Sequence, residues 1–467
     1  MHVRRVTAES NVLAPAPPSI AAPEAGRRRL PSILGVGFGV AVAVGSMIGA
    51  GILRAPADVA ARLPTAPLFL GVWVIGGLYA LLGANAMAEL GTMRPRSGGQ
   101  YVFARHAFGP FVGFVVGWGD WVSSCGSVAV ISLVVADAAG ALVPALAPWA
   151  TWTALAVVAV VTLLACAGAR TGDRAQRTTS LLKGAVLLAL VVACVVWAAT
   201  HDRGAAAVAP APPRGLSLLA ALVVALQGVI FAYDGWVGIL YFTEEVRDPA
   251  REVPRSLFGG VASTLALYLL VNVAFLAVLP LPDIASSPLA AATVAARVFG
   301  AHGAAIVNGI VLLALPSAVI ANLLMGSRVA YALGRDDAAP AWLGGASAGG
   351  APRAAIVVSA ALTAAFLLTG TFERVVAVCS FLFVASYAIS FAALFLLRRR
   401  EPNTPRPWRA RGHPWTTGLV LVGSIAFLGG TVMADVRNGI LALGFVVLSY
   451  PAFRLLRRTG RGSGGRT

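Results

Sequence analysis

Charged residues are scarce in this chain. Only 12% of its 467 residues are Asp, Glu, Lys or Arg, whereas 58% are hydrophobic and the mean hydropathy is +0.81. A soluble domain carries about 25% charged residues. Half of that content, spread over long apolar runs, excludes a soluble enzyme, a nucleic-acid-binding module and a disordered chain. The composition predicts an all-α polytopic membrane protein.

Residues that would carry metal or covalent chemistry are also few. The four cysteines never form a CxxC pair, none of the five histidines belongs to an HExxH motif, and no GxxxxGK[ST] loop is present. These absences argue against a metal site, a disulfide framework, a membrane metalloprotease and an ATP-driven pump. A membrane hydrolase would need a nucleophile and a base facing each other at depth, and no histidine qualifies. We expect no enzyme, no cofactor and no metal.

The apolar runs are numerous enough for twelve membrane spans. A spanning helix needs about 20 apolar residues. No convincing cleavage site follows the first run, so we expect it to be a retained span and not a signal peptide. The predicted spans are residues 32–60, 66–90, 108–136, 150–168, 179–199, 216–243, 256–280, 301–333, 354–371, 375–397, 415–433 and 438–456.

Arginine is distributed unevenly between alternate loops. If the N-terminus lies inside the cell, the inner segments hold 27 arginines and the outer segments hold 7. Because cytoplasmic loops retain positive charge, this ratio predicts twelve spans in the cell membrane with both tails cytoplasmic. The tails are residues 1–31, which are Pro- and Ala-rich and expected to be disordered, and residues 457–467.

Two spans contain residues that disfavour a helix. The first carries GSMIGAG at 45–51 and the sixth carries FAYDGW at 231–236. Glycine disfavours a helix by about 1 kcal/mol, and an Asp at bilayer depth costs about 3 kcal/mol on insertion. One interpretation is that both helices unwind, so that N–H groups at one new helix end receive an anion and C=O groups at another receive a cation.

Each feature alone has a simpler explanation. The Gly45xxxGly49 spacing is also a close-packing motif of ordinary helices, and Asp234 could be hydrogen-bonded within a bundle. The two features, however, lie five spans apart, as expected if spans one to five and six to ten are inverted copies of one unit. Unpaired backbone at membrane depth is tolerated only where it lines a cavity, so the coincidence favours a solute site.

Four stretches carry a family resemblance: GSMIGAGI (45–52), AELGTMRPRSGGQYVF (88–103), FAYDGWVGILYFTEEVRDPAREVPRS (231–256) and GSRVAYALGRDDAAP (326–340). They resemble the amino acid-polyamine-organocation superfamily, and within it the L-type amino acid transporter branch. The resemblance implies an inverted repeat of five plus five helices, with broken helices one and six. The repeats would be residues 32–199 and 216–397, followed by helices eleven and twelve at 415–456.

The resemblance also implies where an amino acid would bind. Its carboxylate would face Ser46, Ala50 and Gly51, and its ammonium would face the carbonyls of Met47, Phe231 and Asp234. Phe231 would also form an aromatic lid between the site and the exterior. The full predicted substrate-binding set is Ser46, Met47, Gly49, Ala50, Gly51, Phe231, Ala232, Asp234 and Gly235. Some relatives bind a partner through a cysteine between spans three and four, but residues 137–149 contain none, so no disulfide-linked partner is expected.

Two residues depart from the pattern of these relatives. Ala50 stands where many have Ser or Thr, so one hydroxyl contact is missing. Asp234 stands where close relatives often have Gly. The carboxylate of Asp234 either favours a basic substrate or proton movement, or it points away and caps a half-helix N-terminus.

Lys183 is the only lysine among 36 basic residues. Helical rise puts it about 9 Å deeper than Arg177, and its side chain either snorkels back to the surface or serves a purpose that arginine cannot. Unlike arginine, a desolvated lysine can release its proton. The resemblance matches Lys183 to a lysine near the broken first helix, where sodium-driven relatives hold sodium. This implies sodium-independent transport, with Lys183 as the coupling residue.

Acidic and basic residues interleave at the inner end of span six. The acidic residues include Glu244, Glu245 and Asp248. They form either a solvated charged surface, where each pair contributes little, or an inner gate. A gate would pair them with Arg94 and Arg96 after span two, or with the inner end of span eight.

The predicted function is therefore secondary active transport of an amino acid by alternating access, as an exchanger or a proton-linked permease. A transporter of polyamines or other organic cations from the same superfamily is the alternative. The expected partners are the small-molecule substrate, membrane lipid and protons as a candidate coupling ion, with no nucleic acid.

Overall fold

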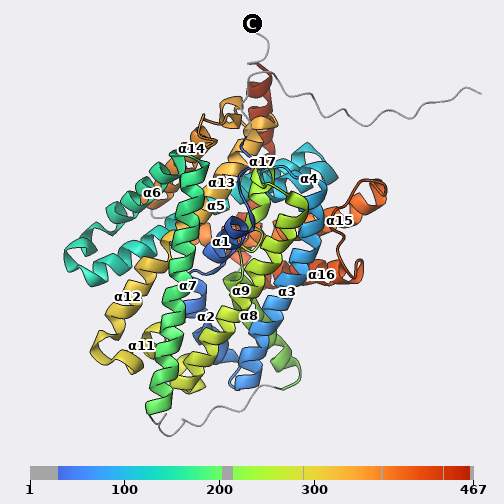
Figure 1. Ribbon diagram of the computed structural model, residues 1–467. Helices are drawn as coiled ribbons and strands as arrows, with labels where there is room; N and C mark the ends of the chain where they lie inside the picture. The colour runs from blue at the N-terminus through green and yellow to red at the C-terminus, as the bar shows by residue number, and fades with distance from the viewer. Residues whose placement is uncertain (1–29, 202–213, 288, 370–371, 435, 463–467) are drawn as a thin grey trace, which may run out of the picture.

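The computed structural model describes residues 30–201, 214–287, 289–369, 372–434 and 436–462. Within these ranges, all regular structure is helical apart from one isolated β-bridge between Leu34 and Val246. Long helices run along the molecule with loops at its two ends (Figure 1). The predicted N-terminal tail lies almost wholly outside the described residues, so its expected disorder stays a prediction.

The helices of the first half of the chain are α1 (Val36–Met47), α2 (Ala50–Arg62), α3 (Ala66–Met93), α4 (Gln100–Phe108), α5 (Pro110–Leu142), the 3-10 helix η1 (Pro144–Trp149), α6 (Ala150–Cys166) and α7 (Ala169–Thr200). Those of the second half are α8 (Leu216–Ala232), η2 (Gly238–Glu245), α9 (Pro249–Val278), α10 (Leu281–Ala285), α11 (Ala290–Phe299), η3 (Gly300–His302), α12 (Gly303–Ala314), α13 (Pro316–Arg335), η4 (Ala341–Gly344), α14 (Arg353–Thr369), α15 (Phe372–Arg400), α16 (Trp415–Ala434) and α17 (Val436–Gly462).

Seven of the helical segments in the described residues are long and apolar enough to cross a membrane. The helices α1 and α2 form a further candidate, bent by 49° at a short break. Shorter apolar helices lie at Leu216–Ala232, Arg353–Thr369, Trp415–Gly430 and Leu443–Leu455. These segments fall one to one on the twelve predicted runs. The protein is therefore a multi-pass membrane protein.

The eighth run differs from its predicted bounds. Residues 301–333 were expected to form it, whereas the apolar helical stretch covers Ala290–Arg335. The stretch is not one straight helix, because α12 ends before Pro316, the first residue of α13. Proline lacks the N–H that an uninterrupted helix would need there.

Both predicted helix interruptions are present. The helix α1 ends at Met47, Ile48 adopts an extended conformation, and α2 begins after Gly49. In the sixth run, α8 ends at Ala232 and a turn follows, in which Gly235 has φ +100°. The chain then continues as the short 3-10 helix η2. The left-handed backbone at Gly235 suits glycine, since other residues adopt it at a steric cost.

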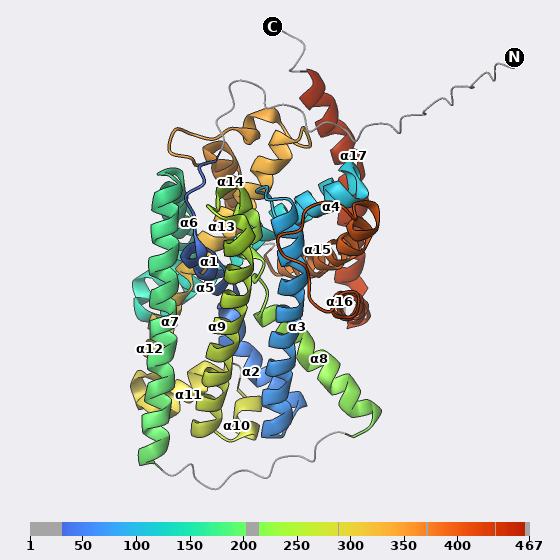
Figure 2. The same ribbon diagram turned by 45° about the vertical axis from the view of Figure 1, so that its right-hand side comes forward.

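Helices of the first half pack against their predicted counterparts in the second half. The helix α3 packs on α9, α5 on α13, and α6 on α14. The helix α1 lies inside the bundle against α7, α9 and α13, as both ribbon views indicate (Figure 2). The last two helices, α16 and α17, pack on α15. The breaks are thus enclosed by the long helices.

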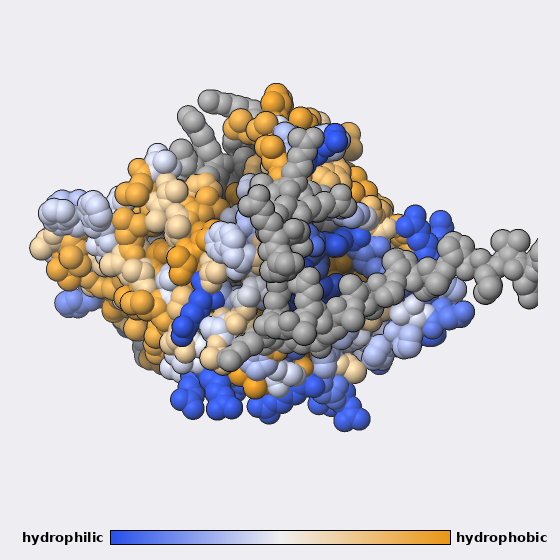
Figure 3. Space-filling view, turned by 90° about the horizontal axis from the view of Figure 1, so that it is seen from above, coloured by the Kyte–Doolittle hydropathy of each residue, from blue (hydrophilic) through white to orange (hydrophobic). Residues whose placement is uncertain are grey.

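Hydrophilic side chains gather at the upper end of the molecule. Viewed from that end, they lie at many places on the face and along its rim, while hydrophobic side chains cover much of one flank (Figure 3). This distribution is typical of a bundle whose sides meet lipid and whose ends meet water.

Candidate substrate site at the two helix breaks

The two interrupted segments touch each other. The hydroxyl of Ser46 lies 2.9 Å from the carbonyl oxygen of Gly235 and donates to it. A side chain at Gly235 would come within 2.7 Å of Ser46, and a Cβ on Gly51 would lie 3.1 Å from Ala232. Glycine at these two positions therefore allows the backbones to approach. An amino acid can enter between the breaks only when they move apart.

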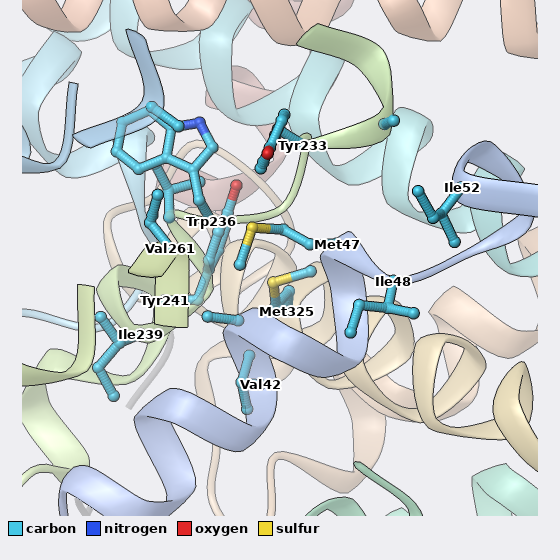
Figure 4. Close-up of a cluster of buried hydrophobic side chains, with 14 of the residues drawn as sticks. Val42, Met47, Ile48, Ile52, Tyr233, Trp236, Ile239, Tyr241, Val261 and Met325 are labelled. Atoms are coloured by element: carbon cyan, nitrogen blue, oxygen red, sulfur yellow. The ribbon is translucent and has the colours of Figure 1, made fainter. Parts of the chain in front are cut away.

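Apolar side chains surround this contact. Met47 and Ile48 come from α1, and Tyr233 and Trp236 come from the segment that follows α8 (Figure 4). All of these side chains are buried. A charged group bound between the breaks would therefore depend on backbone groups and on a few polar side chains for its hydrogen bonds.

Helix α2 offers its N-terminus at the first break. The preceding residue, Gly49, is extended and supplies no side-chain cap. The first N–H groups of a helix have no partner within it and carry partial positive charge. This end is therefore suited to a carboxylate. The side chain of Ala50 lies outside the described side chains.

Lys183 of α7 lies at the opposite polarity of the same break. Its side chain is fully buried, and its Nζ donates to the carbonyl of Gly45 at 2.8 Å and also to the carbonyl of Ile48. Lys183 therefore does not snorkel to the inner surface. Its ammonium satisfies carbonyls at the C-terminal end of α1, which carries partial negative charge.

Tyr268 of α9 joins the two breaks. Its hydroxyl lies 2.8 Å from the carbonyl oxygen of Met47 and 2.8 Å from that of Ala232. Its ring packs against Trp73 and Tyr233, with ring centroids 5.6 and 5.0 Å away. One fully buried hydroxyl thus meets the last residues of both α1 and α8.

Asp234 is held by a tyrosine of α15. The hydroxyl of Tyr387 donates to a carboxylate oxygen of Asp234 at 2.5 Å, and the ring of Tyr387 stacks on Trp236 at 5.3 Å. No ion pair to Asp234 occurs within the described part of the chain, and its side chain does not cap η2. The predicted capping role is therefore not the one that the structure gives it.

The structure brings most of the predicted site residues together and separates one. Phe231 stays apart, because its side chain is 49% exposed on α8, and its carbonyl accepts the N–H of Asp234 at 3.1 Å. The carbonyl that joins Met47 at the break is that of Ala232. The residues at or beside the contact are Ser46, Met47, Gly49, Gly51, Lys183, Ala232, Asp234 and Gly235.

The acidic residues at the end of η2 do not form a solvated surface. Glu245 is fully buried and accepts two hydrogen bonds from Arg328 of α13, at 3.0 and 3.1 Å. The guanidinium of Arg328 also lies 4.9 Å from the ring of Phe242. Glu244 pairs with Arg335 of the same helix at 2.5 Å. These contacts lock η2 to the inner end of span eight.

The predicted partners after span two pair with other residues. Arg94 pairs with Glu401 and Arg96 pairs with Asp336. The solvated interpretation does hold for Asp248, whose pair with Arg251 is 3.7 Å long and largely exposed. The acidic run therefore divides into a buried part, which reaches α13, and an exposed part.

A small cavity lies beside the buried ion pair. Its lining includes Phe38 of α1, Ala169 and Asp173 of α7, and both Glu245 and Arg328. It lies between the start of α1 and the start of α7. Breaking the ion pair would join this space to the solvent at the end of the bundle.

Glu401 forms a second cluster outside the spanning segments. Its carboxylate lies 3.2 Å from Arg94 and 2.5 Å from Nε2 of His106 in α4. Burial alone would raise the pKa of Glu401, but the neighbouring His106 and Arg94 outweigh it and hold that pKa below its ordinary value.

Sequence reasoning missed the aromatic hydroxyls of the site. Tyr268 and Tyr387 lie in ordinary apolar runs, 37 and 156 residues beyond Phe231, and no local pattern marks them. Arg328 was recognised only as a cation near the inner end of span eight. Its pairing with Glu245 becomes visible only once α13 is packed against η2.

Comparisons with known proteins agree with this geometry. The family described as amino acid permease matches residues 39–449. A serine/threonine exchanger of Bacillus subtilis is 24% identical over 424 residues, which cover 87% of this chain and 92% of the relative. An uncharacterized transporter of Mycobacterium tuberculosis is 32% identical over 442 residues, 94% of each chain. The Asc-type amino acid transporter 1 of Mus musculus is 28% identical over 378 residues, 78% of this chain and 70% of the relative.

Proposed function

The chain belongs to the amino acid permease family, and from this premise we propose that it is a sodium-independent secondary transporter that carries an amino acid by alternating access. The observation that carries the proposal is the contact between two helix breaks of complementary polarity. The unpaired N-terminus of α2 suits a carboxylate, and the carbonyls that end α1 and α8 suit an ammonium. An amino acid offers both groups on one carbon.

The proposed architecture is twelve spans, of which the first ten form an inverted repeat. Its support is the pairwise packing of α3 with α9, α5 with α13 and α6 with α14, together with the contact of the two breaks. Such pairs are expected when two copies of a unit are related by an axis in the membrane plane. The cell membrane and cytoplasmic tails are proposed from the arginine ratio.

Lys183 is the proposed substitute for a coupling sodium ion. Its ammonium donates to two carbonyls at the end of α1, and carbonyl oxygens are also the ligands that a hard cation prefers. A cation fixed to the chain at this place removes the need for a bound metal ion. Whether the protein exchanges amino acids or couples uptake to protons is decided by the experiment below.

The buried pair Glu245–Arg328 is the proposed inner gate, with Glu244–Arg335 beside it. Its support is that it joins η2 to α13 next to a small cavity. Phe231 remains the proposed outer lid. Because it lies apart from the contact in this conformation, the lid would have to swing over the substrate as the breaks separate.

Uptake by purified protein in liposomes tests the proposal. A panel of labelled L-amino acids is offered with and without sodium, with and without a pH gradient, and with and without unlabelled amino acid inside. We expect uptake of at least one amino acid that is unchanged when sodium is removed. Acceleration by internal amino acid indicates exchange, and acceleration by an inward proton gradient indicates proton coupling. Uptake that strictly requires sodium would contradict the proposal.

Asp234 favours one alternative substrate class. Its carboxylate lies beside the breaks and has no cationic partner among the described ion pairs, so it could receive an amine. A polyamine or another organic cation is therefore the second candidate. Binding of a diamine, which lacks the carboxylate, is compared with binding of a neutral amino acid. Stronger binding of the diamine would favour the alternative.

A further inference from the structure

Hydrogen-bond donors are too few where the two breaks meet. The hydroxyl oxygen of Tyr268 and the carbonyl oxygens of Met47 and Ala232 lie within 2.8 Å of one another through the tyrosine. The tyrosine hydroxyl supplies a single proton for both carbonyls. Three oxygen atoms therefore share one donor in a fully buried place, where an unsatisfied acceptor is costly.

The neighbouring carbonyls of α1 have no such shortage. Those of Gly45 and Ile48 receive the ammonium of Lys183, which brings three N–H donors. The chain thus supplies its own ammonium on one side of the break and only a hydroxyl on the other. The group that best fills the second place is another ammonium.

We propose that Tyr268 is a substrate-binding residue whose hydroxyl oxygen accepts a hydrogen bond from the substrate ammonium, together with the carbonyls of Met47 and Ala232. This inference rests on the proposed function and adds a contact from α9 to the ammonium site. One ammonium has three N–H donors, which match these three oxygens. Hydrogen bonds to a charged donor are stronger than those between neutral groups.

The surroundings of Tyr268 hold its hydroxyl in place before a ligand arrives. Trp73 packs edge-on against its ring, and Tyr233 packs against its other side. The hydroxyl of Tyr233 turns away from this site and donates to the carbonyl of Trp73. Tyr233 therefore offers a matched control: a buried tyrosine of the same cluster whose hydroxyl does not meet the two carbonyls.

The test compares two probes that differ only in the proposed contact. L-serine carries the ammonium, and L-glycerate carries a hydroxyl in its place. Both are measured as competitors of a labelled amino acid bound to the purified full-length protein. In Tyr268→Phe, we expect the inhibition constant of L-serine to rise about tenfold or more, and that of L-glycerate less than about threefold. Tyr233→Phe should keep the wild-type ratio of the two constants.

A second variant separates binding from folding. Tyr268→4-aminophenylalanine supplies two N–H donors, which can satisfy both carbonyls, but its nitrogen is a poor acceptor. We expect this variant to unfold at the wild-type temperature or above and still to lose L-serine binding selectively. If either variant weakens both probes equally, or leaves L-serine binding intact, Tyr268 only supports the backbone and the inference is wrong.

The failure of the proposed function has a different result. In that case the wild-type protein itself binds none of the labelled amino acids, whatever the variants do. If the wild type ignores L-serine but takes up another amino acid of the uptake panel, the same ratio is measured with that amino acid and its α-hydroxy acid. The same criteria for the two variants then decide.

Discussion

Breaking the pair between Glu245 and Arg328 should release the inner end of the bundle. The two side chains are 0% and 3% exposed and share two hydrogen bonds. Removing one partner of such a pair leaves a buried charge without compensation, which costs about 3–5 kcal/mol. At about 1.4 kcal/mol per tenfold change, Glu245→Gln or Arg328→Gln should shift the ratio of closed to open molecules by about 100-fold or more.

The accessibility of the neighbouring cavity measures this shift. A cysteine is placed at Ala169, which lines the cavity and is 7% exposed, in a background without the four native cysteines. Its reaction rate with a membrane-impermeant maleimide is followed from the cytoplasmic side. We expect each single variant to react far faster than the parent. Arg251→Gln, which removes a highly exposed arginine near the same segment, should react at the parent rate.

The charge-swapped variant, Glu245→Arg with Arg328→Glu, decides whether the pair itself matters. If the attraction between the two groups closes this end, the swap should return the reaction rate most of the way to that of the parent. Single variants that react at the parent rate, or a swap that reacts as fast as the singles, would refute the reasoning.

Three further predictions concern the breaks and the surface. Lys183→Ala should lower uptake in liposomes by about tenfold or more, because two buried carbonyls lose their donor; unchanged uptake would remove Lys183 from the mechanism. Gly235→Ala should lower the unfolding temperature, since its φ is +100° and its Cβ would come within 2.7 Å of Ser46, whereas Gly228→Ala, with open space around it, should not. The ion pairs of Glu401 stabilise the fold above the pKa of the unfolded carboxyl and are lost as pH falls through the lower folded value. Glu401→Gln should therefore reduce the loss of thermal stability on acidification below about pH 4; an unchanged acid profile would count against that contribution.

The breaks could be predicted because they are local. Glycine at 45–51 and an aspartate in an apolar run both conflict with a continuous helix, and the conflict is legible without any tertiary contact. Lys183 was legible for a different reason: one lysine among 36 basic residues is a choice that arginine does not explain. In each case the sequence itself carried the anomaly.

Contacts between distant helices could not be predicted in the same way. Nothing around Tyr268 or Tyr387 distinguishes them from tyrosines that only fill space. Their hydroxyls acquire partners because α9 and α15 pack beside the breaks. The choice between a solvated acidic run and a buried ion pair was equally open for Glu245, since it depends on how close Arg328 comes. The bend at Pro316 also lay beyond the hydropathy pattern, which merges the two helices into one run.

A density map of the protein with and without the amino acid that it transports tests the central claim most directly. The account predicts new density between α1 and α8, with the carboxylate at the N-terminus of α2 and the ammonium at the carbonyls of Met47 and Ala232. The distance between Ser46 and Gly235 should increase in the bound form. Density for the amino acid at any other place, with the two breaks still in contact, would contradict the account.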